Sequence, residues 1–148
     1  MPEAAKMLDY INSKGIRSAV ISNLLWSGEA LKIRFDRLLP RNKFEFVMTS
    51  SDYMFRKPSK LLFDIAIRKS GLLPDEIWYC GDNPYNDVEG AHCAGIIPVW
   101  YENDTDDRPG REKYDYNPSF EFIHIHEWRE LIDILNTLER NQDSWRSS

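Results

Sequence analysis

Short apolar segments alternate with stretches of helical periodicity along almost the whole chain. Five segments have the length and composition of buried strands, at residues 17–23, 44–49, 77–80, 97–101 and 122–125. Around them, apolar residues recur at helical spacing in residues 2–13, 29–39, 59–70 and 127–140, and a short helix is predicted through His92 and Cys93. Strands that alternate with helices form βαβ units, whose parallel strands make a sheet with helices on both faces. The pattern therefore predicts an α/β fold with a mostly parallel sheet.

Turn-forming residues predict where these elements begin and end. Ser27 is placed to cap the second helix, and Gly71 is placed to end the third. Two polar, turn-rich segments predict surface loops, residues 50–59 and 102–118. Residues 141–148 predict a frayed tail, so we expect one core domain over residues 1–140.

Composition excludes several classes of protein. The 148 residues are 42% hydrophobic, enough for one domain with a buried core. A net charge of −5 repels phosphate backbones, which argues against a general nucleic-acid-binding role. No apolar run approaches the ~20 residues of a membrane helix, and the first ten residues lack the features of a signal peptide. Cys80 and Cys93 are too few for a disulfide scaffold and form no Cys-x-x-Cys pair, which favours reduced thiols in the cytoplasm.

Polar and charged residues follow three of the predicted strands. Ser22 and Asn23 follow the first strand, Lys57 lies in the loop after the second, and Asp82 and Asp87 follow the third. In parallel sheets ligands bind beyond the carboxyl ends of the strands, so these five residues are expected to gather at one edge. Each of them alone has a structural explanation, but their joint placement favours a site.

The chemistry that requires this set of groups is phosphoryl transfer. Ser22 and Asn23 are suited to donate hydrogen bonds to a phosphoryl oxygen, and Lys57 to neutralise the charge on that oxygen. Asp82 and Asp87 supply hard carboxylate oxygens of the kind that bind Mg²⁺. The candidate catalytic residues are thus Lys57 and Ser22, the candidate substrate-binding residues are Ser22, Asn23 and Lys57, and the candidate metal ligands are Asp82 and Asp87.

Three stretches that carry these residues resemble motifs of a known family. AVISN with Ser22, FRKPS with Lys57, and WYCGDNPYNDVEGAHCAGI with Asp82 and Asp87 resemble the second, third and fourth motifs of the haloacid dehalogenase superfamily. The resemblance extends from about residue 2 to residue 138. The resemblance implies a Rossmann-like three-layer α/β/α core. It also implies a hydrolase that depends on Mg²⁺ and whose substrate is a small phosphate monoester.

The first motif of that family has no counterpart at the expected place. The family carries Asp-x-Asp at the end of its first strand, where the first Asp is the nucleophile and the second the general acid/base. The only Asp-x-Asp in this chain is Asp104-Thr105-Asp106, which we interpret as surface charge in a loop. In the family the missing strand is central, between the strands that end at Ser22 and Cys80. Its loss would leave those strands ~10 Å apart, so we expect them to close up, or a complementing segment or second copy of the chain to fill the gap. We also expect no turnover from these 148 residues alone.

Two alternatives remain beside a phosphohydrolase core. One is a non-catalytic phosphate-binding or assembly protein derived from the same fold. The other, a receiver-like or dinucleotide-binding domain, is weaker because no Gly-x-Gly-x-x-Gly follows the first strand. His124 and His126 share one side of a short strand, but they lack a recognisable metal-ligand pattern in the sequence. A structural or surface role is therefore favoured for them over a zinc site.

Overall fold

A computed structural model describes residues 2–103 and 114–146 of the chain. The strands are β1 (Ser18–Ser22), β2 (Phe44–Thr49), β3 (Trp78–Gly81), β4 (Ile97–Tyr101) and β5 (Ile123–Ile125). The helices are α1 (Pro2–Ser13), α2 (Gly28–Leu38), α3 (Ser50–Tyr53), α4 (Lys60–Ser70), α5 (Gly90–Cys93) and α6 (Trp128–Arg146). A 3₁₀ turn, η1 (Pro74–Glu76), precedes β3, and a π-helical turn, η2 (Pro84–Glu89), follows it. No helix in this part of the chain combines the length and the apolar character that crossing a membrane requires.

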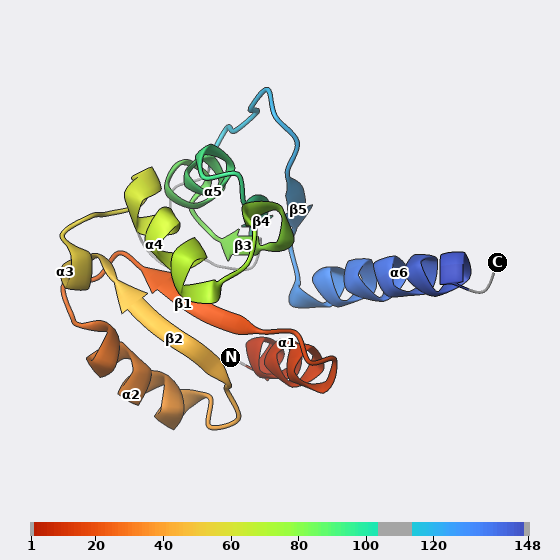
Figure 1. Ribbon diagram of the computed structural model, residues 1–148, viewed down its shortest axis with the longest axis horizontal. Coiled ribbons are helices and arrows are strands. Elements are labelled where there is room, and N and C mark those ends of the chain that lie inside the picture. Colours follow the sequence, from red (N-terminus) through yellow and green to blue (C-terminus); the bar gives the residue numbers. More distant parts are fainter. Residues whose placement is uncertain (1, 104–113, 147–148) are drawn as a thin grey trace.

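The strands form two parallel sheets instead of one. β1 pairs with β2, and β4 lies between β3 and β5 (Figure 1). Within the described residues, β1 and β3 are not paired with each other. The sheet is thus divided at the place where the sequence predicted a missing central strand, and this part of the fold prediction is confirmed.

Helices cover both faces of the strands, as a three-layer core requires. Successive residues of β3 alternate between two clusters, with Tyr79 packed against α4 and α5, and Trp78 and Cys80 packed on the side of α1 and α6. The α1 and α6 side is centred on five buried residues, Met7, Ile11, Val99, Ile125 and Leu131. The predicted Rossmann-like α/β/α architecture is therefore confirmed.

Helix α4 connects the two sheets by burying neighbouring residues against different strands. Leu62 packs with Met48 of β2, and Phe63 packs in the cluster that contains Tyr79 of β3. Both side chains are fully buried, and Ile21 of β1 contacts both clusters. The two sheets are thus held together by packing of side chains from α4, β1 and β3, and not by hydrogen bonds between β1 and β3.

The predicted helix signals are confirmed at both positions. The Ser27 hydroxyl accepts a hydrogen bond from the Ala30 N–H (3.2 Å) at the start of α2. Gly71 follows α4 in the left-handed conformation at φ +68°, which glycine adopts without a steric penalty.

The structure differs from the sequence prediction in residues 50–53 and at the end of α6. Residues 50–53, expected to be loop, form the single-turn helix α3, because Asp52 accepts the Thr49 N–H (2.9 Å) and so caps the turn. Helix α6 continues through Arg146, beyond residue 140 where the sequence predicted its end, because no glycine or proline interrupts residues 141–146. The sequence Asp104-Thr105-Asp106, predicted to be surface charge, lies outside the described residues.

Asp52 also connects the turn after β2 to the beginning of α2. Its carboxylate accepts the Gly28 N–H (2.9 Å) in addition to the Thr49 N–H (2.9 Å). Although desolvation acts to raise the pKa of Asp52, the N–H bonds from Thr49 and Gly28 outweigh it and hold the pKa below its ordinary value of 3.8. The stabilisation from Asp52 is therefore complete above pH 3.8 and is lost as the pH falls through the lower folded-state pKa.

We expect Asp52→Asn to lower the free energy of unfolding by about 1–2 kcal/mol near neutral pH, because an amide cannot accept all of these hydrogen bonds. Urea denaturation of wild type and variant measures the difference. The difference should shrink in acid, where the wild-type carboxylate is protonated as well. A difference of equal size near neutral pH and well below pH 3.8 would contradict this role.

Candidate active site

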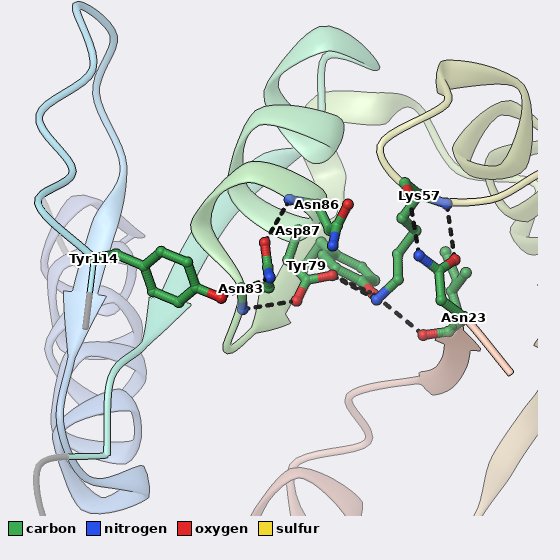
Figure 2. Close-up of polar contacts among 8 residues, drawn as sticks. Asn23, Lys57, Tyr79, Asn83, Asn86, Asp87 and Tyr114 are labelled. Atoms are coloured by element: carbon green, nitrogen blue, oxygen red, sulfur yellow. Dashed lines mark hydrogen bonds and ion pairs between the residues drawn. The ribbon is translucent and has the colours of Figure 1, made fainter. Parts of the chain in front are cut away.

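The five residues predicted from the strand ends lie at the carboxyl ends of β1 and β3 and in the loop before α4. Ser22 is the last residue of β1, and Asp82 directly follows β3. Asn23, Lys57 and Asp87 are joined in one chain of polar contacts (Figure 2). Among the described residues, Ser22 and Asp82 take no part in this chain of contacts. The exposed Asp82 carboxylate still acts through its charge on the pKa of Tyr79.

An ion pair between Lys57 and Asp87 is the centre of the site. Lys57 Nζ lies 2.5 Å from Asp87 Oδ1, and only 11% of the lysine side chain and 4% of the aspartate side chain are exposed. The other carboxylate oxygen, Oδ2, accepts the backbone N–H of Asn83 at 3.0 Å. Burial makes this pair sensitive to the loss of either partner, because the remaining charge would be desolvated without compensation.

The Asn23 side chain holds the backbone of the loop that carries Lys57. Its Nδ2 donates to the Lys57 carbonyl (3.0 Å), and its Oδ1 accepts the Lys57 N–H (2.8 Å). One amide group thus satisfies both backbone groups of Lys57 and attaches the loop to the end of β1.

Tyr79 is a further member of this chain of contacts, and it was not predicted from the sequence. Its hydroxyl accepts a hydrogen bond from Lys57 Nζ (2.9 Å) and donates one to the Ile21 carbonyl of β1 (3.2 Å). Burial, followed by the nearby charge of Asp87, raises the pKa of Tyr79 well above its ordinary value, so the phenol stays protonated. A single hydroxyl therefore connects the ion pair to the open edge of β1.

The η2 turn orients Asp87 toward Lys57. Asn83 caps this turn by accepting the Asn86 N–H (2.8 Å), and its Nδ2 donates to the Tyr114 hydroxyl (2.9 Å). These contacts fix the backbone on which Asp87 stands (Figure 2). Asn83 therefore has a structural role at the start of this turn.

Gly81 leaves the space that Asp87 occupies at the end of β3. A Cβ atom at position 81 would overlap the carboxyl group of Asp87. We expect Gly81→Ala to displace Asp87 from Lys57 and to lower the free energy of unfolding by about 1–3 kcal/mol, as overpacking typically does. Urea denaturation measures this effect, and a variant as stable as wild type would contradict the tight placement of Asp87.

The carboxylates of the site fit a hard divalent cation. Asp82 faces solvent directly after β3, and Asp87 stands on the turn that follows. Asp87 Oδ1 contacts both Lys57 Nζ (2.5 Å) and the Tyr79 hydroxyl (3.5 Å), whereas Oδ2, which accepts the Asn83 N–H, has a second lone pair for an ion. Oxygen donors of this type suit Mg²⁺, which keeps several water ligands and takes few protein carboxylates.

Comparison with known proteins identifies the family. The family model described as haloacid dehalogenase-like hydrolase matches residues 1–100. The chain belongs to the haloacid dehalogenase-like hydrolases. This finding confirms the resemblance that was based on the segments around Ser22, Lys57 and Asp82.

Several haloacid dehalogenase-like relatives are phosphatases by name. A phosphoserine phosphatase from Thermus thermophilus is 32% identical over 101 residues, which cover 68% of this chain and 40% of the relative. A glyceraldehyde 3-phosphate phosphatase from Methanopyrus kandleri is 29% identical over 150 residues, which cover 95% of this chain and 58% of the relative. The chain therefore spans about half the length of these curated relatives.

A solved structure of the same family has the same fold. The crystal structure of a HAD phosphatase from Thermococcus onnurineus superposes with a TM-score of 0.69 at 27% identity. The match covers 91% of this chain and 57% of that one. The similarity thus includes nearly all of the present chain and leaves a large part of the relative without a counterpart.

Proposed function

We propose that this chain is the core of a Mg²⁺-dependent phosphohydrolase that acts on a small phosphate monoester. The observation that carries the proposal is the buried Lys57–Asp87 pair, held at the carboxyl ends of β1 and β3. A lysine kept in place by a carboxylate and a tyrosine is a preorganised cation for a phosphoryl group. The names of the phosphoserine and glyceraldehyde 3-phosphate phosphatases support a small phosphorylated substrate.

Each of the predicted residues has a role in this proposal. The Ser22 hydroxyl and the second amide hydrogen of Asn23 donate to phosphoryl oxygens, and Lys57 neutralises the charge that develops on them. Asp82 and Asp87 hold Mg²⁺, which supplies further charge neutralisation at the phosphoryl group. Tyr79 acts through Lys57 by accepting one of its hydrogens, so it is a positioning residue.

The nucleophile of the proposed reaction has to come from outside the described residues. We propose that a complementing segment ending in Asp-x-Asp pairs between β1 and β3. A second copy of the chain would fill the gap in the sheet but would bring no Asp-x-Asp other than residues 104–106. Within residues 2–103 and 114–146, β1 pairs only with β2 and β3 only with β4, which supports this proposal because open strand edges readily pair with another strand. Without that segment the covalent route is closed, and the chain is inactive.

The second candidate is a non-catalytic phosphate-binding or assembly protein. It is favoured by one observation, the lack of any Asp-x-Asp in the sequence outside residues 104–106. Both candidates predict anion binding at Lys57, whereas only the first predicts turnover once a nucleophile strand is present.

Binding of inorganic phosphate tests the site that both candidates share. We expect Lys57→Ala to weaken binding about tenfold or more, because a charge-assisted hydrogen bond is lost. Lys60→Ala is the matched control, since Lys60 is exposed on α4 and pairs with Asp64. Its effect should be less than about twofold.

Isothermal titration calorimetry measures both variants, with circular dichroism as a check on folding. Lys57→Gln provides a second test if the alanine variant does not fold. Equal effects at positions 57 and 60 would remove Lys57 from the site.

We also propose a cytoplasmic location. Cys80 and Cys93 are both free, which suits a reducing compartment. Burial raises the pKa of the Cys80 thiol to about 12, so this cysteine is protonated and chemically inert.

A further inference from the structure

Glu102, His124 and His126 lie together where β4 and β5 end. The parallel register places Trp100 opposite His124 and Tyr101 opposite Ile125, and the Glu102 N–H donates to the Ile125 carbonyl (2.9 Å). His124 and His126 point to the same side of β5 because side chains alternate along a strand. One potential ligand atom from each of the three residues lies within 4.8 Å of the other two.

Neighbouring residues position the His124 ring and the backbone of His126. The His124 ring stacks on the buried Trp100 ring, with centroids 4.3 Å apart and planes inclined by 6°. Its Nε2 lies 2.9 Å from Glu102 Oε2, and its ring centroid lies 4.5 Å from that of His126. Glu130 fixes the backbone at the start of α6 by accepting the His126 N–H (3.0 Å).

We propose that Glu102, His124 and His126 form a binding site for a divalent transition-metal ion, Zn²⁺ in the first place. Two imidazoles and one carboxylate are the ligand set of Zn²⁺ sites that keep a fourth position open for water. Imidazole nitrogen favours Zn²⁺ over Mg²⁺, which prefers oxygen donors only.

The present spacing requires only small side-chain movements for an ion to bind. Zn²⁺ lies about 2.0–2.2 Å from nitrogen and oxygen ligands, so neighbouring ligand atoms of a tetrahedral site are about 3.4 Å apart. The separations of up to 4.8 Å reach this value by rotation of partly exposed side chains. The ion then replaces the hydrogen bond between His124 and Glu102.

This site is separate from the proposed active site and goes beyond the proposed function. Its ligands come from β4 and the outer strand β5, whereas Lys57 and Asp87 lie toward β1 on the other side of β3. Phosphatase activity therefore does not report on the Zn²⁺ site, and the two proposals fail or hold independently.

Calorimetric titration with Zn²⁺ tests the proposal on the tag-free 148-residue chain. Excess Mg²⁺ is present in the buffer so that sites made of carboxylates alone are already occupied. We expect one ion per chain, and binding at least tenfold weaker in His124→Gln and in Glu102→Gln. His92→Gln is the control, because His92 is exposed and stacks on Phe120 away from the cluster, and its affinity should equal that of wild type. Substitution of Co²⁺ gives an independent signal, a visible absorption band that the two ligand variants lack.

The proposal is overturned if wild type binds no Zn²⁺ in the micromolar range. It is equally overturned if either ligand variant binds as tightly as wild type. Both substituted side chains are partly exposed, so the variants should fold, and circular dichroism verifies this.

Discussion

Replacement of Asp87 by alanine is expected to lower the free energy of unfolding by about 3–5 kcal/mol, the usual effect of leaving a buried charge without its partner. The Lys57 side chain, of which 11% is exposed in the intact pair, would keep the Tyr79 hydroxyl as its one acceptor among the described residues. The Asn83 N–H would lose its acceptor in the same change. Urea denaturation of wild type and Asp87→Ala measures the effect.

An exposed ion pair of the same residue types provides the control. Lys60 and Asp64 lie one turn apart on α4 with a separation of 2.6 Å, and 56% of the lysine side chain is exposed. Asp64→Ala should therefore cost less than about 1 kcal/mol. If Asp64→Ala and Asp87→Ala lower stability equally, the burial of the Lys57–Asp87 pair has no energetic consequence, and the account of the site is wrong.

The meeting of Lys57 and Asp87 could be predicted from the order of the strands. Lys57 and Asp87 are 30 residues apart in sequence but meet in the structure, because parallel strands bring their carboxyl ends to one edge. The apolar segments were enough to predict this, since buried strands and amphipathic helices have distinct periods.

Tyr79 could not be assigned to the site from the sequence. An aromatic residue inside an apolar strand is usually a packing residue, and Tyr79 does pack against Phe63 with ring centroids 5.0 Å apart. Its hydroxyl gains a polar role because Lys57 Nζ reaches it, and because β1 lies close enough for the Ile21 carbonyl to accept a hydrogen bond. That distance depends on the division of the sheet, which is a long-range property.

The cluster of Glu102, His124 and His126 was missed for a similar reason. The sequence placed both histidines on one side of a strand, but the third ligand is 22 residues away from His124. The sequence between β4 and β5 does not indicate which residue of one strand lies opposite which residue of the other. Only the observed pairing of Tyr101 with Ile125 places Glu102 beside the histidines.

A strand that ends in Asp-x-Asp, supplied between β1 and β3, is expected to create phosphatase activity. The strand would hydrogen-bond to both open edges, including the Ile21 carbonyl that now accepts the Tyr79 hydroxyl. It would bring a carboxylate nucleophile and a general acid next to Lys57 and Ser22. The gain in turnover should be on the order of 10⁴-fold or more, because loss of a nucleophile commonly costs at least that much.

The most direct test is an assay of the hydrolysis of a generic aryl phosphate in the presence of Mg²⁺. The assay compares the 148-residue chain with the same chain extended upstream by a strand that ends in Asp-x-Asp. We predict no turnover above background from the chain of 148 residues and clear turnover from the extended chain, abolished by Asp82→Asn. Activity in the shorter chain that Asp82→Asn abolishes would show that the nucleophile lies among these residues. Activity in neither chain would contradict the phosphohydrolase proposal and favour the phosphate-binding protein instead.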